Sequence, residues 1–349
     1  NGTVHTLAQD HVNPDLLFAG TEFGVFFTVN GGAEWTQLKG GIPAVVVKDI
    51  AIQRRENDLV LATFGRGFFV LDDYTPLRQV QPATLDKEFH LFPVKDALMY
   101  VQTSKKYGQG ATYFTAPNPD YGAVFTYYLK EDWQTRKQAR QKQDKELFDK
   151  GKPAPNPSWE ELRQEDKEIP PYLLFTVSDA EGRAVRQLRA KPAKGIQRLA
   201  WDLSYPSPFP VKAKDKFDPL AKDDGGLMVM PGKYRLAVAK VADNVITPLG
   251  EPRDFEARIL ANATLPAPDR PALVRFQRQV AELTRVLQGA MELAGELSGK
   301  LAHIKQTLTA QPGGSNLMAQ ATAIETKLDW VIFAFRGLEP KASDEEVRV

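Results

Sequence analysis

Short apolar runs separated by polar turns dominate the first 80 residues. Turn-forming stretches such as 13–15 and 56–58 interrupt the apolar segments, as expected for half-buried β-strands. Residues 4–27 and 47–70 repeat one pattern, in which Leu7 matches Ile50 and Phe26 matches Phe69. A period of about 40–45 residues with several strands per unit is typical of a propeller blade. We therefore predict about two blades of a β-propeller in residues 1–80.

Residues 81–265 show a second set of short strands with turn signals between them. Their pattern predicts a β-sandwich of the immunoglobulin or fibronectin type. A tight turn at 179–182 joins two of the strands. The expected strands cover 111–114, 123–129, 172–177, 184–188, 196–203, 231–238 and 255–260.

A strongly charged stretch, 130–168, interrupts this sandwich. It predicts one helix to about Lys150, a Pro-rich break, and a short helix opened by a capping box of Ser158 and Glu161. Acidic residues nearly balance the basic ones and no apolar face is present, which argues against a nucleic-acid or membrane helix. We interpret the stretch as a solvated insertion.

The last part, 266–340, has a different period. Apolar residues recur every three or four positions from Leu273 to Leu308 and again from Leu317 to Leu338, which predicts two amphipathic helices joined at 312–314. Because the second helix is shorter, Leu273 to Leu283 need another partner, which is a further helix, the sandwich or a second copy of the chain. The fold class is thus multidomain, mainly β plus α, ending in an antiparallel helical hairpin and a tail, 341–349.

The octet from Thr28 to Trp35 (TVNGGAEW) has the form of an Asp-box. Its pattern residues are Thr28, Asn30, Gly32, Glu34 and Trp35. Asn30 is expected to start the turn through its own backbone, the glycines to take positive φ, and Trp35 to fold back as an apolar plug. The Asp-box is therefore a folding device and not a catalytic motif.

The stretches GTEFGVFFTVNGGAEW and RENDLVLATFGRGFFVLDD together resemble the end of the propeller in bacterial sortilin-like proteins with BNR repeats. Members of that family are commonly labelled glycosyl hydrolases. The resemblance implies a secreted or periplasmic protein, of which this chain is a C-terminal fragment. It also implies further blades, in cis or on a separate polypeptide, because propellers have about four to eight.

Two functions follow from the resemblance. In the first, the complete propeller is a binding or scaffold module that recognises a peptide or a glycan. In the second, the parent is a glycoside hydrolase whose catalytic carboxylates lie in the other blades. A third possibility concerns assembly, since the unpaired part of the hairpin favours a homodimer.

Composition excludes several other kinds of site and function. The chain of 349 residues has no cysteine, which excludes disulfides, thiolate metal sites and cysteine nucleophiles. A net charge of +1 gives no global field for nucleic acid or an anionic membrane. No apolar run reaches the roughly 18 residues of a membrane span. His5 and His11 lack metal-ligand spacing, so we expect neither a metal nor another cofactor.

Four residues at blade turns are candidates for a cleft: Glu22, Arg66, Asp72 and Asp73. A glycosidase needs two carboxylates about 5 Å or about 6.5–9.5 Å apart. No catalytic constellation stands out, and the catalytic residues of this region stay unknown. The simpler interpretation is that Asp72 and Asp73 cap a turn and that Arg66 pairs with one of them.

Overall fold

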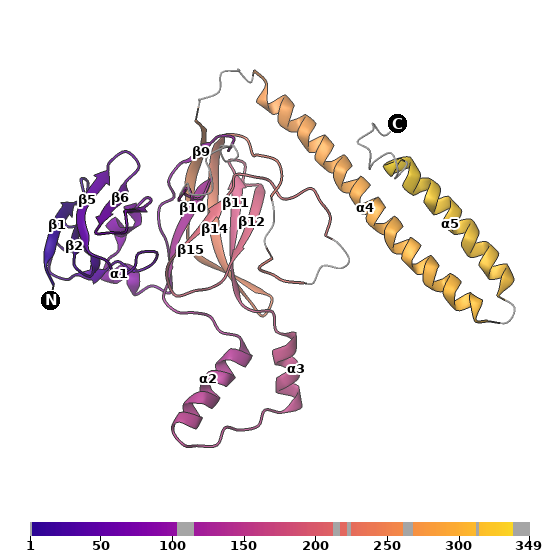
Figure 1. Cartoon of the computed structure of the whole chain (residues 1–349), viewed down its shortest axis with the longest axis horizontal. Helices are drawn as coiled ribbons and strands as arrows, with labels where there is room; N and C mark the ends of the chain where they lie inside the picture. Colours follow the sequence, from indigo (N-terminus) through magenta and orange to yellow (C-terminus); the bar gives the residue numbers. More distant parts are fainter. Residues whose placement is uncertain are drawn as a thin grey trace. The chain divides into compact units, whose positions relative to one another are not determined.

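The computed structural model describes residues 2–102, 115–211, 217–221, 225–260, 268–311 and 314–337. It is a multidomain, β-rich structure with helices (Figure 1). One compact unit holds residues 1–204, 219–222 and 231–264, and a second holds 205–218, 223–230 and 265–349. The strand expected at 111–114 and most of the turn expected at 312–314 lie outside the described residues.

The first unit begins with two antiparallel meanders. The first meander is a four-stranded sheet and the second a three-stranded sheet, each with its strands in chain order. The strands of the first are β1 (Val4–Gln9), β2 (Leu17–Thr21), β3 (Gly24–Thr28) and β4 (Thr36–Gln37). Those of the second are β5 (Val47–Gln53), β6 (Asp58–Thr63) and β7 (Phe68–Leu71).

The two meanders share one hydrophobic core. Residues that are paired across antiparallel strands point to the same face of a sheet. Phe18, paired with Phe27, therefore lies on the face that meets the second meander, where Leu59 and Leu61 are also buried. Gly20 permits close approach, because a Cβ there would lie 2.9 Å from Cγ1 of Val47.

A short link after β7 completes this core. It consists of the 3₁₀ helix η1 (Thr75–Gln79) and the single-turn helix α1 (Pro82–Leu85). Tyr74, Leu77 and Val80 are buried in the same cluster as the meander residues. The ring of Tyr74 packs edge-on against Phe18, with 5.2 Å between the ring centroids.

Two further sheets pack against each other in the first unit. One has the order β13-β10-β8 and the other β12-β11-β14-β15-β9. Aromatic rings join them, since Phe125 contacts both Phe175 and Phe255, and the fully buried Trp201 contacts Tyr234. The strands are β8 (Phe89–Leu91), β9 (Ala97–Met99), β10 (Ala123–Leu129), β11 (Tyr172–Asp179), β12 (Ala184–Ala190), β13 (Gly195–Trp201), β14 (Gly232–Ala242) and β15 (Val245–Ile259).

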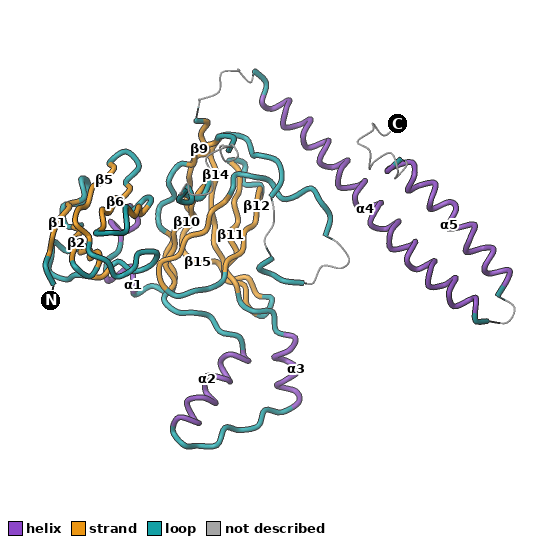
Figure 2. The backbone as a smooth tube through the Cα atoms, in the orientation of Figure 1, coloured by secondary structure: helices purple, strands orange, loops and turns teal. Residues whose placement is uncertain are grey.

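The charged insertion contains two helices, α2 (Arg136–Asp149) and α3 (Trp159–Lys167) (Figure 2). Both begin with a capping box, and the one at Ser158 is the box that the sequence predicts. Arg140 of α2 bonds both carboxylate oxygens of Glu165 on α3, at 2.6 and 2.8 Å. Neither helix has a buried residue, which agrees with a solvated insertion.

The second unit is built on two long helices that form the predicted hairpin (Figure 1). Helix α4 covers Arg270–Thr309 and helix α5 covers Ser315–Arg336. At about 1.5 Å per residue, α5 reaches along only about half of α4. Ala294, Leu301 and Ala321 are the residues buried between them. No helix of the described chain has the length and apolar character that a membrane span requires.

Candidate functional site

The Asp-box turn is held by its own side chains. The hydroxyl of Thr28 donates to Oδ1 of Asn30 at 2.8 Å, and that same Oδ1 accepts the amide of Glu34 at 3.0 Å. Oγ1 of Thr28 accepts the amide of Gly32 at 3.1 Å, where φ is +100°. Trp35 folds back over Gly32 but keeps 41% of its surface exposed, so it covers the turn only in part.

The four cleft candidates do not lie together. Glu22 is in the β2–β3 turn and Arg66 in the β6–β7 turn, which are at the same end of their meanders. Asp72 and Asp73 follow β7, and β7 crosses the sheet once after Arg66. The amide of Asp73 accordingly bonds Asp58, at the start of β6 and the opposite end from Arg66. The expectation of a shared cleft therefore fails, because one strand separates the two groups.

Asp73 and Asp72 have structural roles at their end of the sheet. The carboxylate of Asp73 accepts from the amide and hydroxyl of Thr75, at 3.2 and 2.7 Å, and so holds the turn that leads into η1. Arg198 of β13 donates to the backbone carbonyls of Asp72 and Asp73, at 2.7 and 2.5 Å. Burial, and then the charge of Asp58, raise the pKa of Asp72. Arg66 forms no ion pair with any described residue, contrary to the pairing that we expected.

A buried polar cluster that the sequence analysis missed joins the first meander to η1. Asp10 is fully buried and accepts Nε and Nη2 of Arg78, both at 2.7 Å, and the hydroxyl of Tyr74 at 2.6 Å. The backbone amides of Val12 and Asn13 complete its shell. The partners are 64 and 68 positions apart, so no local motif marks them.

The electrostatics of this cluster indicate a structural role. Burial alone would raise the pKa of Asp10, but the hydrogen bonds from Arg78, Tyr74 and the Asn13 amide, with the charge of Arg78, hold it well below its usual range. Burial and the bond to Asp10 raise the pKa of Tyr74. Since both oxygens of Asp10 are occupied by strong donors, no lone pair is left for a substrate.

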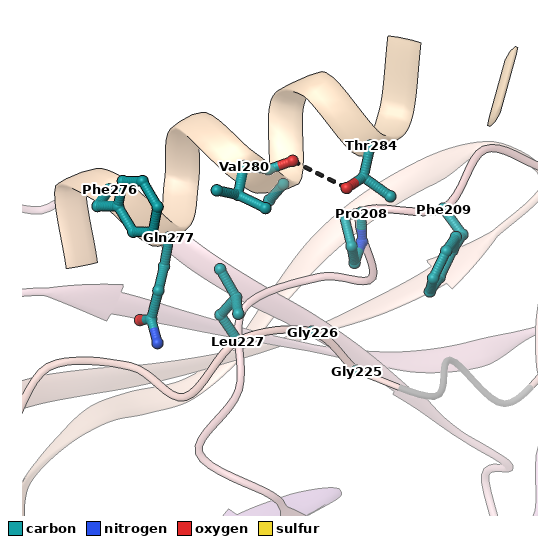
Figure 3. Close-up of a pocket in the computed structure, with 10 residues that line it drawn as sticks. Pro208, Phe209, Gly225, Gly226, Leu227, Phe276, Gln277, Val280 and Thr284 are labelled. Carbon is teal, nitrogen blue, oxygen red and sulfur yellow. Dashed lines mark hydrogen bonds between the residues drawn. The ribbon is translucent and has the colours of Figure 1, made fainter. Parts of the chain in front are cut away.

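The second unit contains an apolar groove between helix α4 and the loop that follows Ser204 (Figure 3). Its volume is about 410 Å³, within the range of small-ligand sites. Phe276 and Val280 of α4 face Leu227 and Pro208 across it, and the Gln277 amide points into it (Figure 3). Phe276 and Val280 are still 63% and 44% exposed, so the loop covers this part of the Leu273–Leu283 stretch only incompletely.

Backbone and side-chain bonds shape the loop side of this groove. The amide of Gly226 donates to the Tyr205 carbonyl, and the amide of Tyr205 donates to the Leu227 carbonyl, both at 2.8 Å. Arg278 of α4 bonds the Tyr205 hydroxyl at 2.6 Å and stacks on its ring at 4.6 Å. The groove suits an apolar side chain or acyl group. A long loop rich in Pro and Gly is the sequence signal that points to this region.

No cluster of three or more His, Asp or Glu side chains suited to a metal ion occurs in the part of the chain that the structure describes. His5 lies in β1, and His11 follows that strand beside Asp10, 3.5 Å from Nδ1 to Oδ1.

Comparisons with known proteins give no family. No family model matches the chain, and no curated protein matches it. Solved structures that it resembles include an extracellular domain described as part of a one component system from B. thetaiotaomicron, at 11% identity and a TM-score of 0.17 over 74% of this chain. Another is dimeric latent PorU from Porphyromonas gingivalis, at 12% identity, a TM-score of 0.23 and 68% coverage. A third is the extracellular domain of a hybrid two component system from B. thetaiotaomicron, at 8% identity and a TM-score of 0.19 over 73% of this chain.

The chain spans only 25%, 13% and 26% of those three chains. Because the TM-scores lie far below 0.5, these likenesses carry no argument about fold or function.

Proposed function

We propose that the two meanders are blades of a β-propeller, and that the protein is an extracellular binding or scaffold module whose complete propeller recognises a peptide or a glycan. The proposal is supported by one observation, which is that the second meander repeats the first in detail and leaves one face without a partner.

The registers of β1–β3 and β5–β7 correspond, although the turn from Thr63 to Gly67 is one residue longer than that from Thr21 to Gly24. β1 has a register shift between Val4 and Thr6, and β5 has one between Val47 and Asp49. In the following turns, the Thr21 hydroxyl donates to the Gly24 carbonyl, just as that of Thr63 donates to the Gly67 carbonyl. These matches superpose Phe18 on Val60, Val25 on Phe68 and Phe27 on Val70.

The superposition identifies an uncovered face. In the first meander, Phe18 and Val25 are fully buried and Phe27 is half-buried, and all three belong to the core shared with the second meander. Their counterparts in the second meander point away from that core, and Phe68 is 77% and Val70 54% exposed. Repeated sheets that stack in one direction, as propeller blades do, leave this face free to receive a further sheet. Exposed apolar patches of this kind mark interaction sites.

The partners that fit are the remaining blades, in cis or from another polypeptide. The propeller assignment, and the secreted or periplasmic location that goes with it, rest on the resemblance to the BNR-repeat family and on this repeat geometry.

A glycoside hydrolase is the second candidate. Its two carboxylates must lie within about 10 Å of each other, whereas Glu22 is at one end of the meanders and Asp72 and Asp73 follow the opposite end of β7. For this reason we favour a binding module. A hydrolase would need catalytic carboxylates from further blades.

The deciding experiment exposes the protein to arrays of immobilised glycans and peptides, beside hydrolysis assays with fluorogenic glycosides. We expect binding without turnover. Turnover of a glycoside would support the hydrolase instead. Absence of both binding and turnover would contradict a recognition function for these meanders alone.

A further inference from the structure

The hairpin of α4 and α5 has two unlike sides. Its seam is formed by Ala294, Leu301 and Ala321, which are all buried. With about 100° of rotation per residue, Lys305 and Glu325 lie on the same side of that seam. They form an ion pair there, with Nζ 2.5 Å from Oε2. One side of the hairpin is therefore polar, and an ion pair joins the two helices there.

The opposite side is apolar. A row on α4 and a row on α5 run along it at intervals of seven or four residues, the spacing of a heptad seam. Each of these large side chains keeps between 38% and 55% of its surface exposed, although it borders the buried seam. We call this surface the apolar side, and its residues are Val286, Leu293, Leu297 and Ile304 on α4 and Leu317, Ile324 and Val331 on α5.

The seam leaves these rows uncovered. Its fully buried members are two alanines and one leucine, and half-buried residues such as Leu308, Leu328 and Ile332 complete it. Most helical stability in proteins comes from packing an amphipathic face, and the rows extend that face beyond the seam. The larger residues beside the seam become buried once a further helix layer covers them.

Charge allows that layer to be another copy of the chain. The stretch 289–309 of α4 carries two acidic residues, Glu292 and Glu296, and two lysines, Lys300 and Lys305. Helix α5 likewise has two acidic and two basic residues. Two identical hairpins would thus meet without net repulsion, whereas a strongly charged partner would find no complementary field.

We propose that the apolar side is a homodimer interface, on which a second copy packs its own apolar side about a twofold axis to make a four-helix bundle. Such a contact is isologous and closes on itself, and it extends the α4–α5 seam into a bundle core. Seven half-exposed side chains per copy give a buried area on the order of 1,200 Å² in total, which is the lower bound for a stable interface.

Light scattering coupled to size-exclusion chromatography tests this proposal on the full chain. The expected mass is twice the 38.9 kDa of one chain. The double variant Leu293→Glu/Ile304→Glu should elute as a monomer, because it buries four carboxylates in the dimer. The matched control, Glu292→Lys, changes an exposed residue on another side of the same helix and should stay dimeric.

A second measurement keeps the test decisive if the double variant is less helical. The melting temperature of a dimer rises with protein concentration, so we expect a concentration-dependent melting temperature for the wild type and none for the variant. A wild-type monomer, or a dimer that survives both glutamates, would overturn the proposal. Neither result would bear on the proposed propeller, since no meander residue is changed.

Discussion

Arg78 and Asp10 form a two-pronged, buried ion pair across 68 positions of the chain. Asp10 directly follows β1 and Arg78 lies in η1. The ion pair therefore holds η1, which follows the second meander, against the first meander. Tyr74 adds its hydroxyl to the same carboxylate.

Removal of one partner from this pair should destabilise the protein strongly. In Arg78→Met the Asp10 carboxylate stays buried without its cation, and we expect a loss of about 3–5 kcal/mol in the free energy of unfolding. Tyr74→Phe removes one hydrogen bond to a charged group and should cost about 1.5–3 kcal/mol. Urea unfolding measures both. Arg55→Met, which breaks an exposed pair with Glu56, is the control and should change stability by less than about 1 kcal/mol.

The same carboxylate should make stability depend on acid pH. Because the pKa of Asp10 is depressed in the folded state, its contribution is complete above its unfolded pKa of about 3.9 and is lost as the pH falls toward the folded value. The urea midpoint should therefore drop below about pH 5. In Asp10→Asn the midpoint is lower at pH 7 and falls less steeply with acid. Equal acid slopes in the two proteins would contradict this assignment.

Phe68 lies on the uncovered face of the second meander, and Leu59, in its core, is the matched control. Phe68→Ser changes a residue that is 77% exposed and should alter stability by no more than about 0.5 kcal/mol. Leu59→Ser changes a fully buried residue and should cost at least about 2 kcal/mol. Thermal and urea unfolding of both variants would decide. A large loss for Phe68→Ser would mean that this chain covers the face itself.

Two glycines of the second unit should respond in opposite directions to alanine. A Cβ on Gly226 would lie 2.3 Å from the Pro206 carbonyl oxygen, so Gly226→Ala should displace the loop beside the groove and destabilise it. A Cβ on Gly289 of α4 meets nothing within 4 Å, and Gly289→Ala should stabilise the helix by about 0.5–1 kcal/mol. Circular dichroism melting curves compare them. A destabilised Gly289→Ala would show that this face of α4 is covered.

Local periodicity predicts much of this fold. The hairpin turn at 179–182 joins β11 to β12, the Ser158 capping box opens α3, and the three-and-four spacing yields α4 and α5. These features depend on neighbours within a few residues, which the sequence displays directly. The capping box of Thr135 and Gln138 at the start of α2 is of the same kind. It lies in a uniformly polar stretch, where no apolar periodicity indicates the residue at which the helix begins.

The site is harder to predict because its contacts are distant in the sequence. The grouping of Asp10, Tyr74 and Arg78 depends on how two meanders stack, and no spacing rule encodes that. The groove beside α4 depends on the path of a loop. The separation of Arg66 from Asp72 was predictable, because a strand of four residues lies between them and carries the chain across the sheet.

The pairing of β9 with β15 has a consequence for synthesis. These strands are parallel, and the neighbouring bond from the Glu256 amide to Asp96 joins residues 160 positions apart. At about 5–20 residues per second, the ribosome needs on the order of 8–30 s to make that interval. Throughout that delay β9 has no partner strand. This sheet is therefore completed only after β15 has been made, whereas each meander has its strands adjacent in the chain and can form as it emerges.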